Sequence, residues 1–235
     1  MDLFVGTRNN EYKFDITDKE FHHCVRVTRH KTGDEILVTD FNGVIYHGRI
    51  QAIHPEELNV EILGIYKEEA QDVPKISIAI SLTQPMDRFE WFVEKAVENG
   101  IHEIIPILCK RTEMDKLKME RLQKIIEASA KQTLRPLKPE LHELQKLNEV
   151  IVNRKSIAQK FIGHCEDGLE GFLGKKYNPS KDVLVLIGPA GDFTKEEIEL
   201  AKANDFIPIS LGDYRLRTET AGLTALQILQ TIRQL

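Results

Sequence analysis

The run Val183–Ile187 places the strongest constraint on the fold, because all five of its residues are valine, leucine or isoleucine. A strand that covers one face of a sheet alternates apolar and polar residues, whereas an unbroken apolar run is typical of a strand buried on both faces. Shortly afterwards, Thr194–Glu197 has the pattern of a capping box and predicts the start of a helix. The chain is therefore expected to contain a parallel sheet covered by helices on both sides.

The same alternation of strands and helices extends from about residue 71 to the last residue. The apolar residues Phe89, Phe92, Val93, Ala96 and Val97 recur at the spacing of one helix face. Further helices are predicted around residues 122–129 and over 221–232, and strands over 76–82, 104–108, 161–162 and 207–211. Residues 71–235 are therefore predicted to form one α/β domain.

Residues 1–70 are predicted to form a separate, β-rich domain. Strands are expected on either side of Asn42-Gly43, because both residues of that pair tolerate the positive φ angles of a tight hairpin. Thr17–Glu20 has a second capping-box pattern and predicts one short helix. This pattern favours a small barrel with a single helix, and the polar stretch Lys67–Pro74 is expected to be a linker.

The net charge of −5, from 32 basic and 37 acidic side chains, argues against general nucleic-acid binding, for which a basic domain is usual. Two segments depart from this average. Residues 21–33 contain no acid, and residues 110–138 contain nine lysines and arginines against four acids. Each segment is a candidate surface for phosphate contacts, and a solvated helix face is the simpler interpretation of the second.

The sequence gives no support for a membrane span, a secretory signal or a zinc cluster. No apolar run approaches the roughly 20 residues needed to cross a bilayer, and the first residues lack the basic and apolar regions of a signal peptide. The three cysteines, Cys24, Cys109 and Cys165, are far apart and form no CxxC pair. We therefore expect a cytoplasmic protein with reduced thiols, no bound metal and no membrane contact.

Two glycine-containing loops are the strongest candidates for a binding site. Gly188–Phe193 follows the buried strand directly, and Ser210–Ala221 follows the last predicted strand and leads into the final helix. Ligands of open α/β sheets bind beyond the carboxyl ends of the strands. The spacing fits neither a Walker A loop nor GxGxxG, so a triphosphate or dinucleotide site is not indicated. The structural alternatives are a tight turn in the first loop, and in the second a capping Glu219 with salt-bridged arginines.

Together the two loops make the sequence resemble the RsmE family within the SPOUT-class RNA methyltransferases. That family has a GPEGG-type loop and a later LG…LR.ETA segment, which stand here as Gly188–Phe193 and Leu211–Ala221. Similar segments also lie at Met86–Ala96 and His22–Arg29, so the resemblance covers essentially the whole chain. Ala190 stands where the family usually has glutamate, which removes a carboxylate from the loop but leaves its backbone donors and acceptors.

The resemblance implies a PUA-like RNA-binding β-barrel over residues 1–70 and a SPOUT α/β-knot methyltransferase domain, with a deep trefoil knot, over residues 71–235. It also implies the cofactor S-adenosyl-L-methionine, held by the backbone loops of the knot, and a homodimer whose second subunit completes the site. The implied cofactor contacts are Ile187, Gly188, Pro189, Ala190, Gly191, Leu211, Gly212, Leu216, Arg217 and Thr218.

The reaction implied by the resemblance is methylation of N3 of a uridine in 16S ribosomal RNA, either as free rRNA or in the assembled 30S subunit. Arg217 is the expected catalytic residue, because a guanidinium can stabilise the negative charge that develops on the uracil carbonyls. The expected RNA contacts are His23, Arg26, Arg29, Arg111, Gln132 and Arg135. The alternative is a non-catalytic RNA-binding or ribosome assembly factor that kept the fold, and Ala190 is the feature in its favour.

Overall fold

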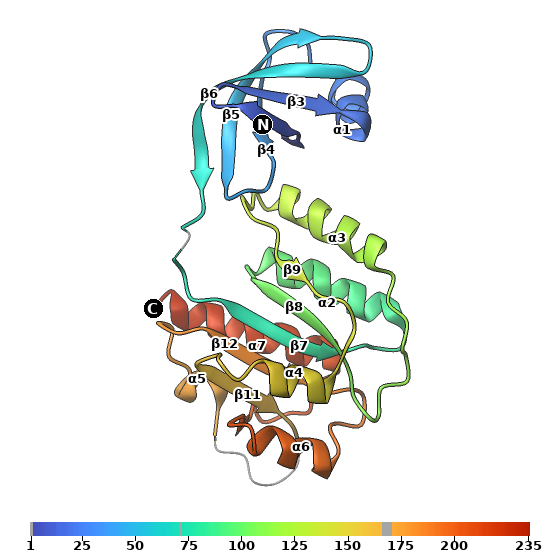
Figure 1. The fold of residues 1–235 in the computed structure, drawn as a ribbon, viewed down its shortest axis with the longest axis vertical. Coiled ribbons are helices and arrows are strands. Elements are labelled where there is room, and N and C mark those ends of the chain that lie inside the picture. Colours follow the sequence, from blue (N-terminus) through green and yellow to red (C-terminus); the bar gives the residue numbers. More distant parts are fainter. Residues whose placement is uncertain (1, 71, 166–170) are drawn as a thin grey trace. The chain divides into compact units, whose positions relative to one another are not determined.

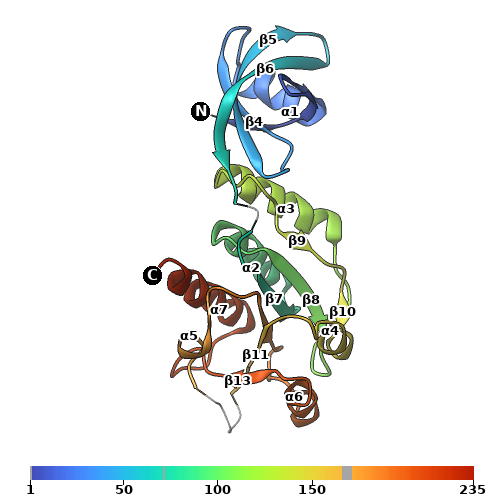
Figure 2. The same ribbon diagram turned by 60° about the vertical axis from the view of Figure 1, so that its left-hand side comes forward.

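The computed structural model describes residues 2–70, 72–165 and 171–235, which fold as two compact units (Figures 1 and 2). One unit contains Met1–Asp72 together with Ala130–Lys138, and the other contains Val73–Ser129 and Pro139–Leu235. The first unit is therefore discontinuous in sequence, whereas the sequence alone places residues 130–138 in the second domain. None of the described helices combines the length and the hydropathy that a bilayer crossing would need.

Six strands form the sheet of the first unit, in the order β1-β4-β5-β6-β3-β2. They are β1 (Leu3–Val5), β2 (Thr7–Asn10), β3 (Lys13–Thr17), β4 (Glu35–Thr39), β5 (Val44–Ile53) and β6 (Glu57–Glu68). The edge strands β1 and β2 are separated only by Gly6, so the sheet is strongly curled. Within the described residues these two edges form no ladder with each other. The sheet is thus an open half-barrel and not the closed barrel that was expected.

The hairpin predicted at Asn42-Gly43 is confirmed, since β4 and β5 pair in antiparallel fashion on either side of it. The connection has four residues, 40–43, instead of two. Its positive φ angles occur at Phe41 (60°) and Gly43 (94°). The side chain of Asn42 instead donates to Asp40 Oδ2 at 3.0 Å. The Asn-Gly pair therefore predicted the position of the turn correctly, but it did not predict the length or the backbone conformation of the turn.

The short helix predicted after Thr17 is present as α1 (Asp18–His22), which continues into a π-helical turn, η1 (His23–Val27). Its capping box does not form, because the Thr17 side chain makes no cap hydrogen bond. Glu20 is used elsewhere: its carboxylate accepts the backbone N–H of Val5 at 3.0 Å and lies 2.7 Å from Lys131 Nζ. The acid that the pattern assigned to the helix start therefore attaches the helix to the sheet.

The returning segment Ala130–Lys138 is fastened to the first unit by ion pairs and apolar contacts. In addition to the Lys131–Glu20 pair, Arg135 Nη2 lies 3.8 Å from Glu69 Oε1. Leu134 packs against Leu3, Leu37 and Ile45. Two cations of the basic stretch 110–138 thus have structural partners in the first unit, so its positive charge is only partly free for other ligands.

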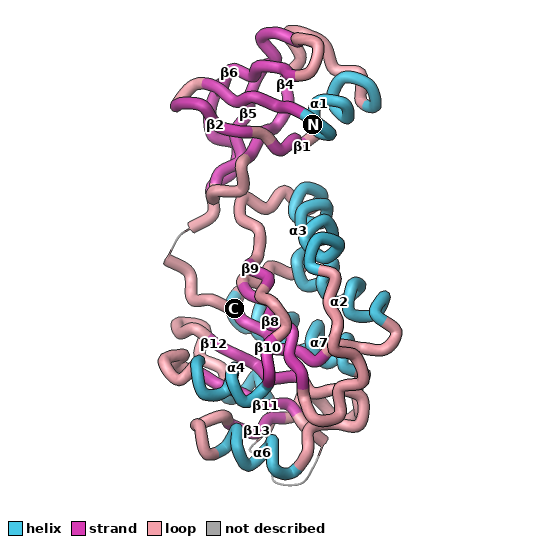
Figure 3. Tube along the Cα trace, turned by 45° about the vertical axis from the view of Figure 1, so that its right-hand side comes forward, coloured by secondary structure: helices cyan, strands magenta, loops and turns pink. Residues whose placement is uncertain are grey.

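The second unit contains a parallel sheet in the order β10-β8-β7-β12-β11-β13, with β9 also paired to β8 (Figure 3). Its strands are β7 (Ile76–Ser81), β8 (Glu103–Leu108), β9 (Glu140–Leu141), β10 (Gln145–Lys146), β11 (Gln159–Gly163), β12 (Val183–Ile187) and β13 (Ile207–Ile209). Its helices are α2 (Met86–Glu98), α3 (Met119–Gln132, whose last residues belong to the first unit), α4 (Leu147–Asn153), α5 (Leu173–Lys176), α6 (Lys195–Lys202) and α7 (Thr218–Arg233).

Helices cover both faces of this sheet, as the apolar run Val183–Ile187 predicted. Every residue of β7 and β12 is buried. Leu184 and Leu186 pack in one core with residues of α4 and α6, while α7 and α2 pack together over β7 on the other side (Figure 1). The capping box at Thr194–Glu197 is also confirmed, with both of its reciprocal hydrogen bonds present.

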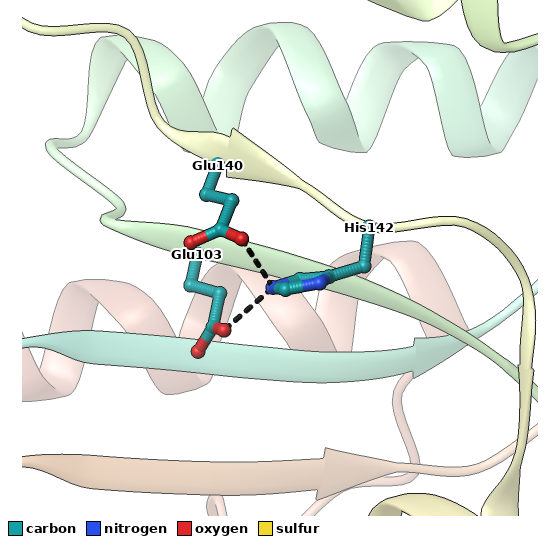
Figure 4. Close-up of side chains that lie close together, drawn as sticks. All are labelled: Glu103, Glu140 and His142. Atoms are coloured by element: carbon teal, nitrogen blue, oxygen red, sulfur yellow. Dashed lines mark hydrogen bonds and ion pairs between the residues drawn. The ribbon is translucent and has the colours of Figure 1, made fainter.

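A charged cluster attaches β9 to the edge of the sheet, and Figure 4 shows its carboxylates converging on one imidazole. His142 Nε2 lies 2.6 Å from Glu103 Oε1 and 3.4 Å from Glu140 Oε1. Arg154 Nη1 lies 2.7 Å from Glu103. Burial raises the pKa of Glu103, but the Ser77 hydrogen bond and the Arg154 charge outweigh it, so this pKa lies below its ordinary value. Glu103 is therefore the charged centre of the cluster.

We predict that Glu103→Gln lowers the free energy of unfolding by about 3 kcal/mol at pH 7, because Arg154 loses its buried counter-charge. A carboxylate with a lowered folded pKa stabilises the protein above its unfolded pKa, and this contribution is lost as the pH falls through the folded value. The wild-type advantage should therefore shrink below about pH 4.5. Urea titrations across this range measure it, with the exposed Glu140→Gln as control. An advantage that is constant down to pH 3 would contradict this assignment.

Candidate functional site

A pocket of about 850 Å³ in the second unit lies at the carboxyl edge of the parallel sheet. Residues at or just after the ends of four strands line it: Gly163 (β11), Ile187 (β12), Ile209 (β13) and Leu82, which follows β7. Parallel strands present all their carboxyl ends at one edge, which is where open α/β sheets bind ligands. Both loops singled out in the sequence therefore meet at this edge.

One hydrogen bond joins these two loops, which are 30 residues apart in sequence. Thr218, the first residue of α7, is buried, and its Oγ1 donates to the carbonyl of Gly188 at 3.0 Å. Because a buried carbonyl without a partner is costly, this bond fixes the start of α7 against the end of β12. The two loops therefore form the two sides of one pocket.

The loop after β12 is shaped by its glycines and by Phe193. A Cβ on Gly188 would lie 3.0 Å from the buried Phe193 ring, and Gly191 has a φ of +88° that other residues rarely adopt. The Asp192 carboxylate accepts the backbone N–H of Cys165 at 2.6 Å through Oδ2 and that of Phe193 at 2.8 Å through Oδ1. The contacts of Asp192 and Phe193 therefore hold the loop in place, and its backbone borders the pocket.

Arg111 also holds this loop in place, through hydrogen bonds to its backbone. Its guanidinium donates to the carbonyl of Gly191 and, at 3.4 Å, to that of Phe193. A guanidinium occupied by two backbone carbonyls has less capacity for an RNA phosphate. The contacts of Arg111 thus indicate a role in positioning the loop.

The second loop leaves β13 through an open turn. Gly212 has a φ of +144°, and a Cβ built there would meet open space. Ser210 Oγ donates to the carbonyl of Gly212 at 2.9 Å and accepts its N–H at 3.0 Å. Beyond this turn Tyr214 is 87% exposed, and Arg217 is also exposed, at the N-cap position of α7 without a side-chain cap bond. Exposed aromatic and cationic groups therefore border the pocket on this side.

All ten residues expected to contact the cofactor line this pocket: Ile187, Gly188, Pro189, Ala190, Gly191, Leu211, Gly212, Leu216, Arg217 and Thr218. Sequence reasoning missed its third wall, formed by Leu82, Thr83 and Gln84 after β7 and by Arg88 on α2. The polar residues that follow the predicted strand 76–82 were the available signal. Sequence reasoning also treated Glu219 as a cap, although it is a buried acid that lines the pocket.

The expected RNA contacts outside the pocket have different surroundings within the first unit. His23, Arg26, Arg29 and Gln132 are exposed there. Arg135 is only 8% exposed and is paired with Glu69, so its burial argues for a structural role and against the RNA contact expected from the sequence. That burial also lowers the pKa of the Arg135 guanidinium relative to a free arginine.

One group of three potential metal ligands in the described part of the chain lies away from the pocket. The group formed by Glu103, Glu140 and His142 is compact enough to hold an ion, but it sits at the amino end of β8, opposite the carboxyl edge that carries the pocket. Arg154 already supplies positive charge to Glu103. Burial raises the pKa of the Cys109 thiol to about 12, which keeps it protonated at neutral pH. Neither group adds a metal or thiolate centre to the pocket.

Two family models match this chain. One is described as an RNA methyltransferase domain and matches residues 70–230, and the other as an RNA methyltransferase PUA domain and matches residues 16–63. A curated relative named "Ribosomal RNA small subunit methyltransferase E", from Bacillus subtilis, is 27% identical over 225 residues, which cover 91% of this chain and 88% of the relative.

Solved structures extend the match to the whole fold. The crystal structure of a probable rRNA-methyltransferase from Porphyromonas gingivalis is 33% identical, with a TM-score of 0.91, and the match covers 100% of this chain and 99% of that one. The ribosomal RNA small subunit methyltransferase E from Neisseria gonorrhoeae, solved bound to S-adenosyl methionine, is 25% identical with a TM-score of 0.84. That match covers 98% of this chain and 97% of the other.

We predict that Thr218→Val destabilises the second unit by about 1–3 kcal/mol, because the carbonyl of Gly188 loses its buried donor. Thr218→Ser keeps the hydroxyl and should retain most of the stability. Chemical denaturation followed by circular dichroism measures both variants. Amide exchange over residues 188–193 should also accelerate in the valine variant alone, and equal behaviour of the two variants would show that the bond does not hold the loops.

Proposed function

Because the chain belongs to the RNA methyltransferase family, we propose that it transfers a methyl group from S-adenosyl-L-methionine to N3 of a uridine in 16S ribosomal RNA. One observation carries the proposal: both glycine loops of the family-like sequence converge on one pocket, held together by the Thr218–Gly188 hydrogen bond. The names of the relatives supply the ribosomal small subunit. We also propose that the chain acts in the cytoplasm, because its proposed substrate is ribosomal RNA. The base to be methylated follows from the sequence resemblance.

The residues of the pocket fit S-adenosyl-L-methionine. Its walls are glycine-rich backbone and the apolar side chains of Ile187, Leu211 and Leu216, which suit a ligand with an adenine ring and several polar groups. At Gly212 the backbone borders space that a side chain would occupy. When bound, the cofactor supplies a methyl group on a positively charged sulphur that is already a good leaving group. The protein therefore needs to position its substrates more than to activate them.

Arg217 is the proposed catalytic residue. Its backbone caps α7 beside Thr218, and its exposed side chain lies on the rim of the pocket. A guanidinium at this position can face the incoming uracil and stabilise the negative charge on its carbonyls as N3 loses its proton. Alignment of N3 with the methyl group lowers the activation barrier further, and for well-oriented reactants this reduction can reach about 7–11 kcal/mol.

RNA capture is assigned to the exposed His23, Arg26, Arg29 and Gln132 of the first unit. The match of residues 16–63 to an RNA methyltransferase PUA domain supports this assignment for His23, Arg26 and Arg29. Because N3 lies on the pairing edge of uracil, the target must be unpaired or flipped out of its helix. The substrate is free small-subunit rRNA or the assembled 30S subunit, and phosphate contacts with shape recognition suit either.

The topology and the assembly are also part of the proposal. We assign residues 71–235, apart from the segment 130–138 that folds with the first unit, to a SPOUT α/β domain with a deep trefoil knot, and residues 1–70 to a PUA-like RNA-binding domain. We also propose a symmetric homodimer centred on the second domain, in which the partner completes the pocket. The apolar residues of α7 are candidates for this interface. Ala225 and Leu229 are buried within their own unit, whereas Ile228 and Ile232 are partly exposed and are the contacts that we propose.

The most direct test of the reaction is mass spectrometry of 16S rRNA from cells with and without this protein. The proposal requires one uridine to carry an N3 methyl group only when the protein is present. The runner-up, a non-catalytic assembly factor that kept the fold, has less support, because the relatives are named as methyltransferases and one holds the cofactor. That alternative would leave rRNA methylation unchanged.

We predict that Arg217→Ala lowers methyl transfer by about 100-fold or more while the melting temperature stays the same, because the exposed guanidinium acts on substrate and not on packing. Arg217→Lys should also be slow, since an ammonium cannot make a planar two-pronged contact. Single-turnover assays with rRNA measure both variants. Wild-type turnover with a lowered melting temperature would assign Arg217 to the structure.

We predict a solution mass of twice the 27.0 kDa chain mass, because the proposed site needs a second subunit. Multi-angle light scattering at micromolar concentration measures it. Replacing Ile228 and Ile232 by aspartate should shift the equilibrium to monomer, whereas aspartate at the exposed Gln227 should not. A wild-type mass near that of one chain would count decisively against the shared site.

A further inference from the structure

Glu219 is a buried acid that the proposed reaction leaves without a role. It is the second residue of α7, it lines the pocket, and the residue is 8% exposed. Its one ion pair in the described structure is long, with 3.9 Å between Glu219 Oε1 and Arg88 Nε. Burying a carboxylate is expensive unless charge or hydrogen bonds compensate it. The start of α7 and Arg88 provide part of this compensation, and the carboxylate retains capacity to interact with a ligand in the pocket.

We propose that Glu219 is the residue that makes the pocket prefer S-adenosyl-L-methionine to its demethylated thioether product. This inference rests on the proposed cofactor and not on the identity of the methylated base. The two ligands differ by one methyl group and by the positive charge on sulphur. A sulfonium has no N–H to donate, so it is recognised by the field of a nearby anion. A shielded carboxylate with spare capacity provides such a field, because low local polarity strengthens charge interactions.

The other acids around the pocket are less suited to this role. Both oxygens of Asp192 already accept backbone N–H groups, from Cys165 and Phe193. Asp213 and Glu113 are exposed, so water and salt screen their charges. Glu219 is therefore the acid near the pocket that is both shielded from bulk solvent and uncommitted to the loop backbone.

Arg88 is expected to act on the ligand preference in the opposite direction to Glu219. Its guanidinium stands beside Glu219 and offsets part of the negative charge that a cationic ligand would meet. Removal of Arg88 should therefore strengthen the preference for the sulfonium form, while removal of the Glu219 charge should weaken it. A merely structural ion pair would behave differently, because the loss of either partner would weaken the binding of both ligands.

The test is calorimetric titration of the full chain with S-adenosyl-L-methionine and, separately, with S-adenosyl-L-homocysteine. The quantity compared is the ratio of the two dissociation constants in wild type, Glu219→Gln and Arg88→Met. We expect Glu219→Gln to reduce the preference for the sulfonium about tenfold, with the affinity for the thioether changed less than twofold. Arg88→Met should increase the preference severalfold. Asp213→Asn removes the same charge from an exposed position and should change the ratio less than twofold.

Each result decides the matter. Equal weakening of both ligands in Glu219→Gln would assign the carboxylate to structure or to the ammonium group that both ligands carry, and would overturn the proposal. An unchanged ratio, or a weaker preference in Arg88→Met, would overturn it as well. A wild-type protein that binds neither ligand would remove the premise together with the proposed function, so the two failures are distinguishable.

Discussion

The hydrogen bond from Thr218 to the carbonyl of Gly188 is the contact on which the functional site depends. It connects the end of a fully buried strand to the start of the last helix, and the two loops on either side of it become two walls of one pocket. Parallel strands make this possible, because they bring residues from distant parts of the chain to one sheet edge. The loop glycines then let backbone, and not side chains, form the surface that meets a ligand.

The basic stretch 110–138 shows why charge counts alone misjudge a surface. Lys131 and Arg135 make ion pairs with Glu20 and Glu69 within the first unit, and Arg111 supports the carbonyls of the loop after β12. From the sequence alone, these three cations could have contacted RNA phosphates. In the structure they maintain the fold, which leaves the exposed His23, Arg26, Arg29 and Gln132 as the stronger candidates for nucleic-acid contacts.

Local patterns predicted much of the architecture, because their signals depend on neighbouring residues. The run Val183–Ile187 predicted a doubly covered parallel strand, and Thr194–Glu197 predicted a capped helix, as observed. Features that depend on distant partners were not predictable in this way. Glu20 is bonded to Lys131 instead of capping α1, the sheet of the first unit stays open, and residues 130–138 return to that unit. The pocket wall after β7 and the buried position of Glu219 also depend on tertiary packing, which spacing along the chain does not encode.

The central claim is that two loops, distant in sequence, bind one cofactor together. Hydrogen-exchange mass spectrometry of the full chain with and without S-adenosyl-L-methionine tests it most directly, since exchange reports backbone protection segment by segment. If the two loops share one cofactor, residues 188–193 and 211–218 become protected over the same range of cofactor concentration. Protection of only one loop, or of neither, would contradict a shared pocket.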